Sequence, residues 1–180
     1  MDNTQSVKDW LSARRAVKDG QLEVLRSLIE QNAIDPLRED SELLRMAAEC
    51  QHPEIVAYLI PLSDPQAENS LALRWACEKP GLRCVELLLP HSDPKAENSA
   101  ALRLAVTYGN YEAAKLLFGV SEPDKAFQML ISRPGISYGR ENVPEKFMEL
   151  WHEHKLKQRI EKAVGHALNK PQRTTSPRKL

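Results

Sequence analysis

The stretch "SDPQAENSLALRWAC", residues 63–77, decides the fold because the chain repeats it at a constant interval. It returns as "SDPKAENSAALRLAV" at residues 92–106, and a looser copy, "IDPLREDSELLRMAA", occupies residues 34–48. Each copy begins 29 residues after the previous one. A period of about 20–50 residues is typical of stacked supersecondary units that bury their apolar faces against one another. The repeat therefore predicts an elongated array.

Each unit is predicted to be a pair of helices. The Asp-Pro dipeptide favours a turn, and a polar pair after it supplies an N-cap oxygen for the first helix. These pairs are Asp40-Ser41, Asn69-Ser70 and Asn98-Ser99. The second helix carries the more apolar segments "EIVAYLI", "RCVELLL" and "YEAAKLLF", and Pro61 and Pro90 end it in two copies.

The columns of the repeat predict which side chains form the core. Large apolar and small residues recur with the same period, and in the middle copy Trp75 or Cys77 is also available to the core. The recurring residues are Leu44, Leu73 and Leu102, with Ala47, Ala76 and Ala105. Because alanine lets neighbouring helices approach closely, we expect one apolar stripe to run through the stack.

The ends of the chain extend this array. We expect an N-terminal capping repeat over residues 1–34, with a helix over 7–17, and three repeats over residues 35–120. Residues 121–168 are predicted to hold a degenerate repeat, a loop over 132–142 and a helix from Val143 to Leu168. On that helix, Phe147, Trp151, Ile160, Val164 and Leu168 are expected to face the last repeat as a cap. Residues 169–180 are predicted to be a basic disordered tail.

Composition indicates a folded, soluble protein with an uneven distribution of charge. The formal net charge is zero, yet residues 155–180 hold eight Lys or Arg and one acid. The other 154 residues therefore carry 17 bases and 24 acids. Three cysteines without a CxxC pair favour a reducing compartment, so we expect a cytoplasmic protein, in a host cell if the source is a pathogen or virus. No segment is long and apolar enough to predict a membrane span.

The repeat resembles the ankyrin family over roughly residues 10–130. Its "DP.A" and "LR.A" elements match the family's "DPNA" and "LH.AA", and "YGNYEAAKLLF" at residues 108–118 is similar to "NGHLEVVKLLL". The period is 29 rather than about 33, and about three of the missing residues fall where the family has a β-hairpin finger. The expected fold is thus an all-α, ankyrin-like α-solenoid with stunted fingers and a C-terminal capping helix.

Ankyrin arrays act as protein-binding scaffolds and are not enzymes, and the resemblance implies the same here. It implies another protein as partner, with no small-molecule substrate, cofactor or metal, and we expect a monomer. Contact residues in the family cluster at the C-terminal end of the inner helix. The matching positions are Glu49, Cys50, Glu78, Lys79, Thr107 and Tyr108, with Gln66 and Lys95 as weaker candidates. The alternative is that these variable columns are simply solvated.

Other groups of polar residues in the sequence favour a structural role over a functional one. His152 and His154 lie two residues apart, which points them away from one another on a helix and disfavours a metal site. Cys77 and Cys84 are interpreted as buried apolar residues rather than as a reactive pair. No motif predicts a catalytic centre.

Two basic features admit a functional alternative. One arginine recurs in each repeat and forms a ladder: Arg45, Arg74 and Arg103. Each arginine is expected to pair with the glutamate six residues earlier in its own repeat, which is Glu39, Glu68 or Glu97. The alternative is that the ladder binds an acidic partner. With the basic tail, the ladder makes a nucleic-acid-associated adaptor the alternative function.

Overall fold

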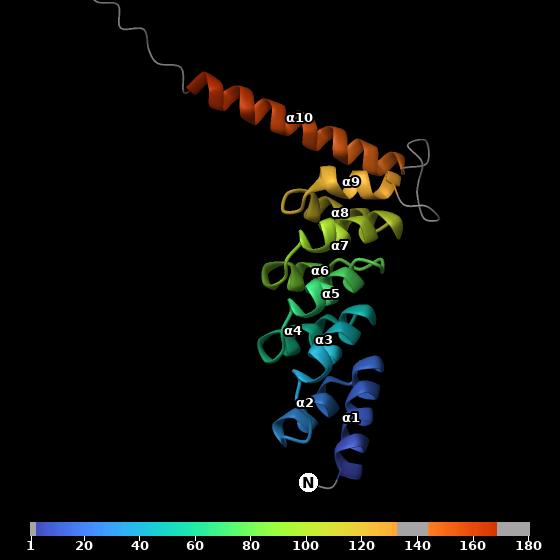
Figure 1. Cartoon of the computed structure of the whole chain (residues 1–180). Helices are drawn as coiled ribbons and strands as arrows, with labels where there is room; N and C mark the ends of the chain where they lie inside the picture. The colour runs from blue at the N-terminus through green and yellow to red at the C-terminus, as the bar shows by residue number, and fades with distance from the viewer. Residues whose placement is uncertain (1–2, 133–143, 169–180) are drawn as a thin grey trace, which may run out of the picture.

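The computed structural model describes residues 3–132 and 144–168, and these form a long stack of short helices (Figure 1). The predicted loop over 132–142 falls almost wholly, and the predicted tail wholly, outside the described residues. In chain order the elements are α1 (Asn3–Lys18), α2 (Leu22–Glu30), α3 (Arg38–Glu49), α4 (Pro53–Leu59), η1 (Ile60–Leu62), α5 (Ala67–Ala76), α6 (Arg83–Leu88), η2 (Leu89–His91), α7 (Ala96–Thr107), α8 (Tyr111–Phe118), α9 (Pro123–Ser132) and α10 (Glu145–Leu168).

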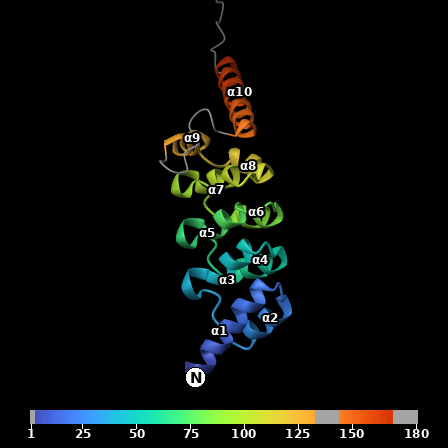
Figure 2. The same ribbon diagram turned by 90° about the vertical axis from the view of Figure 1, so that its right-hand side faces the viewer.

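The helices form two layers along the stack. Figure 2 shows α3, α5, α7 and α9 on one side and α4, α6 and α8 on the other. We call the first of these the first-helix side. Residues 3–132 and 144–168 contain no strand, so the hairpin fingers are absent and short turns join the helix pairs. The predicted all-α solenoid is confirmed.

One apolar seam runs the length of the described array. The side chains of Leu44, Leu73 and Leu102 are completely buried, as are those of Ala47, Ala76 and Ala105. They belong to a single cluster of packed side chains that extends from Trp10 in α1 to Phe147 in α10. Isolated helices of 6–12 residues are marginal in water, so this shared burial is what stabilises each unit. The core columns read from the sequence are therefore confirmed.

The second helices end where the prolines predict. The α-helix stops at Leu59 in one repeat and at Leu88 in the next, and Pro61 and Pro90 then lie in the 3₁₀ turns η1 and η2. Proline lacks an N–H and clashes with the carbonyl four residues earlier, whereas a short 3₁₀ turn tolerates it near its start.

Three residues at the start of each first helix adopt a left-handed turn. In the middle copy, Glu68, Asn69 and Ser70 have φ values of 48°, 58° and 58°, and the same positions of the two flanking copies agree with them. Such a conformation costs about 1–2 kcal/mol per residue other than glycine. Contacts from elsewhere must therefore hold the turn in place, and two contacts repeat in every copy.

The first contact comes from the next repeat. The Ser70 hydroxyl oxygen accepts a hydrogen bond from the backbone N–H of Asp93 at 2.8 Å, and Ser41 and Ser99 bond Asp64 and Glu122 in the same way. The prediction that these serines cap the first helix is wrong. A capping residue has an extended backbone, whereas the left-handed φ of each serine turns its hydroxyl toward the following repeat.

The second contact comes from the arginine ladder. Nη2 of Arg74 donates to the backbone carbonyl of Glu68 at 3.1 Å, and Arg45 and Arg103 do the same to Glu39 and Glu97. The Glu68 carboxylate instead pairs with Arg45 of the preceding repeat at 3.0 Å. The structural interpretation of the ladder therefore holds, although the bond within each repeat goes to the backbone carbonyl.

Replacing Ser70 by alanine is expected to lower the free energy of unfolding by about 1–2 kcal/mol, because the Asp93 amide loses its acceptor in a partly buried hydrogen bond. Urea denaturation would show this as a lower midpoint at an unchanged slope. Ser12→Ala is the matched control, since the Ser12 hydroxyl is exposed and bonds only its own helix. Equal midpoints for the two variants would contradict the role given to Ser70.

Side chains at the start of two second helices add bonds between repeats. The Nδ2 of Asn110 donates to the carbonyls of Lys79 and Gly81 at 2.6 and 3.1 Å. The side chain of His52, in the same column two repeats earlier, lies 3.1 Å from the carbonyl of Lys18. These bonds fix the turns between the two helices of the preceding unit, where the predicted contact residues lie.

The C-terminal helix caps the stack with its first half only. Phe147 is buried between Phe118 and Phe127, at ring-centroid distances of 5.4 and 6.1 Å, and Trp151 stacks on Phe127 at 5.0 Å. Asp124 of α9 accepts a hydrogen bond from Trp151 and pairs with Lys155. The bond from Lys155 is the main cause that lowers the pKa of Asp124, so this link is present when Asp124 is ionised.

The expectation that Ile160 and Val164 also face the last repeat is wrong. They are 54% and 52% exposed, as is Leu156 at 58%, and this part of α10 extends beyond α8 and α9 (Figure 1). Nine residues separate Trp151 from Ile160, which at about 100° per residue places the two side chains on opposite faces of the helix. The Leu168 side chain lies outside the described residues.

Candidate functional site

Two grooves open on the first-helix side of the stack. The first, which we call the N-terminal groove, is bordered by α1, α3 and α5 and lined by Arg14, Lys18, Glu42, Arg45, Met46, Glu49, Cys50, Trp75 and Lys79. The second, the C-terminal groove, lies between α5, α7 and α9 and is lined by Arg74, Glu97, Ala100, Arg103, Leu104, Thr107, Tyr108, Met129 and Leu130. Both arise from the stacking of first helices, so neither exists within a single repeat.

The lining of the N-terminal groove combines apolar and charged side chains. Trp75 is only partly buried, and the Arg45 guanidinium lies 5.9 Å from the centre of its ring. Met46 occupies the same column one repeat earlier. The sequence predicts Trp75 as a possible core residue. In the structure Trp75 is only partly buried, and it lines the groove.

The C-terminal groove has fewer charged residues in its lining than the N-terminal groove. Tyr108 at the end of α7 is 58% exposed, which leaves most of its ring open to a partner. Leu104 and Met129 are partly buried beside it, and Leu130 is buried. An aromatic ring that is already held by its helix adds contact area at little entropic cost on binding.

Five of the six predicted contact residues line these grooves. Glu49, Cys50 and Lys79 lie in the N-terminal groove, and Thr107 and Tyr108 lie in the C-terminal groove. Glu78 is partly buried and lines neither groove. The weaker candidates Gln66 and Lys95 are exposed in the inter-repeat turns, where their backbone amides bond Asp64 and Asp93.

The sequence reasoning missed several groove residues, and one signal for them was present. Met46, Trp75 and Leu104 stand 29 residues apart and are apolar but not fully buried. When a repeat position is always apolar but its residue type differs between copies, the side chain is expected to lie partly in the core and partly at the surface. Arg14 and Lys18 carried no such signal because α1 lies outside the regular repeat.

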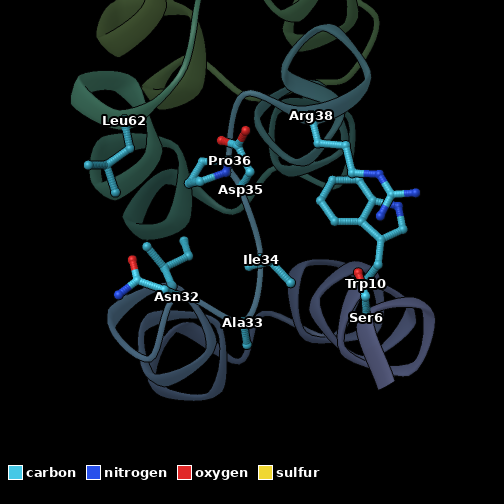
Figure 3. Close-up of a pocket in the computed structure, with 10 residues that line it drawn as sticks. Ser6, Trp10, Asn32, Ala33, Ile34, Asp35, Pro36, Arg38 and Leu62 are labelled. Carbon is cyan, nitrogen blue, oxygen red and sulfur yellow. The ribbon is translucent and has the colours of Figure 1, made fainter. Parts of the chain in front are cut away.

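A third pocket lies where the first repeat meets the N-terminal helices (Figure 3). It is bordered by Trp10 of α1, by the linker that contains Ile34 and Asp35, and by Leu62. Arg38 covers the Trp10 ring at 4.7 Å from its centre (Figure 3). None of the predicted contact residues lies in this pocket.

The described residues offer little reactive chemistry. Burial raises the pKa of the Cys77 thiol to about 12 and that of the Cys84 thiol to about 11, so both remain protonated near neutral pH. Burial also raises the pKa of Cys50, with a further contribution from Glu49. Residues 3–132 and 144–168 contain no group of three or more His, Cys, Asp or Glu that could hold a metal ion. None of the helices described could cross a membrane.

Comparison with known proteins agrees with this geometry. Residues 44–126 match the family model for ankyrin repeats, in three copies. The similarity to ankyrin repeats therefore covers just under half of the chain. No curated protein matches the chain. Ankyrin repeats are generally protein–protein interaction modules and are typically not enzymes. The matched residues include all of α5, α7 and α8, so the two grooves lie largely on the ankyrin repeats themselves.

Proposed function

We propose that this protein is a non-enzymatic scaffold, adaptor or inhibitor that binds another protein on the first-helix side of its ankyrin repeats. The observation that carries the proposal is the position of the variable columns. The residues that differ between copies at the ends of the first helices line two grooves on one side, while the residues that recur form the seam.

The rigidity of the frame supports binding of this kind. Each left-handed turn is bonded both within its repeat and to the next one, and the seam is continuous from α1 to α10. A surface held this way loses little conformational freedom when a partner docks, so more of the contact energy appears as affinity.

The same bonds favour protein binding over the nucleic-acid alternative. The guanidinium groups of Arg45, Arg74 and Arg103 each donate to a backbone carbonyl of their own repeat. These three guanidinium groups are thus engaged in the fold, which makes them less available to a phosphate backbone.

Tyr108→Ala is expected to weaken partner binding about tenfold or more, because tyrosines in partly closed pockets are frequent hot spots. The partner would be isolated with the wild-type chain from its native cell, and its affinity for each variant measured by calorimetry. Leu116→Ala is the matched control, since Leu116 is 40% exposed on α8 in the other layer. Loss of binding with the control and not with Tyr108→Ala would place the binding surface elsewhere.

We also propose that the protein works in a reducing compartment such as the cytoplasm. All three cysteines are free thiols, and two of them are buried in the seam. Thiol titration of the denatured protein, taken from its native cell under conditions that block exchange, should find three free groups. A disulfide between any two of them would contradict this proposal.

A further inference from the structure

The N-terminal groove is basic on a body that is acidic. Residues 1–154 carry 17 bases and 24 acids, yet this groove is lined by four bases and two acids. The bases are Arg14, Lys18, Arg45 and Lys79, and they come from two helices, α1 and α3, and from the turn after α5. A positively charged groove on a negatively charged protein body favours partners with negative charge.

Part of this positive charge is neutralised within the fold. Arg14 pairs with Glu42 at 3.1 Å, and Arg45 pairs with Glu68 at 3.0 Å. Both pairs join neighbouring helices, so these two arginines are used to hold the array together.

Lys18 and Lys79 are different. Both side chains are exposed, and neither ammonium forms an ion pair with any residue in the described ranges. Cys50 lines the groove together with both lysines. Each ammonium lowers the pKa of the Cys50 thiol, against the larger effects of burial and of Glu49, which raise it. The groove therefore presents two lysines without an ion-pair partner, in the same lining as Cys50 and Trp75.

We propose that the N-terminal groove binds an acidic segment of the partner protein, with carboxylates on Lys18 and Lys79 and an apolar side chain against Trp75 and Met46. This inference rests on the proposed function and adds the chemistry of the partner. A short protein segment fits better than a nucleic acid, because Glu42 and Glu49 stand in the same groove and the acidic body repels a long polyanion.

The test is selection of peptides from a phage-displayed random library on the intact chain. Peptides rich in Asp and Glu with an apolar anchor are expected to be enriched. Their affinity should fall about tenfold or more for the K18Q/K79Q double variant and should decrease with salt more steeply for the wild type than for that variant. K8Q/K115Q is the matched control, because it removes two exposed lysines from α1 and α8 that line neither groove.

The outcomes separate this inference from the proposed function. Selected peptides that lack acids but need Trp75 or Tyr108 would overturn the acidic partner and leave the binding surface in place. Peptides that bind all of these variants equally, or no selected peptide at all, would count against both. A single-stranded oligonucleotide of about 20 bases that binds more tightly than the selected peptides, and loses affinity with K18Q/K79Q, would overturn the inference in favour of nucleic acid.

Discussion

Replacing Leu73 by alanine is expected to lower the free energy of unfolding by about 2–5 kcal/mol. Leu73 is completely buried in the middle repeat, where α5 packs against α3 and α7. The cavity would lie at the centre of the seam, so it would weaken the interfaces on both sides of the repeat. Because small domains are stable by only about 5–15 kcal/mol, this is a large part of the total.

Urea denaturation followed by circular dichroism measures this effect. Leu37→Ala is the matched control, since Leu37 is 55% exposed and its truncation should change the unfolding free energy by less than about 1 kcal/mol. In a stack held together by contacts between neighbours, weakening the middle repeat can also separate the transitions of the two halves. A Leu73→Ala midpoint equal to that of Leu37→Ala would show that no shared seam passes through this repeat.

Phe147→Ala is the second substitution with a large expected effect. It should cost about 3–5 kcal/mol of folding free energy. The ring is completely buried and contacts the rings of Phe118 and Phe127. Its loss removes the main apolar contact that docks α10 on the stack. If the free energy that holds α10 on the stack is smaller than the cost of the cavity, α10 will detach before the repeats unfold. The surfaces of α8 and α9 that α10 covers will then be exposed to solvent.

Hydrogen exchange measured by mass spectrometry distinguishes these events. Residues 145–155 should lose protection in Phe147→Ala, and the peptides of α8 and α9 should exchange faster than in the wild type. Leu156→Ala is the control, because Leu156 lies on the exposed half of the same helix. Wild-type protection of residues 145–155 in Phe147→Ala would mean that polar contacts such as Trp151 to Asp124 suffice to dock the helix.

The mistaken expectations have two different origins. Ser70 was expected to act within its own helix, because capping patterns are local, but its hydroxyl bonds the next repeat. Trp75 was offered to the core because it is apolar, but the packing of α3 and α5 leaves its ring open to a groove. Ile160 was placed with Trp151, although the helical period puts it on the opposite face. The first two depend on neighbours far away along the chain, whereas the third was available from the sequence.

The class of fold, the period, the core columns and the ends of two of the second helices were predictable from the sequence alone. These follow from local rules, since helical periodicity, proline geometry and the recurrence of Leu and Ala act within one repeat and are written three times. The left-handed turns, the hydrogen-bond partner of each serine and arginine, and the two grooves depend on how the repeats pack together. Their energies come from contacts between repeats, and a conformation that costs energy locally is stable only when the neighbouring unit supplies those contacts.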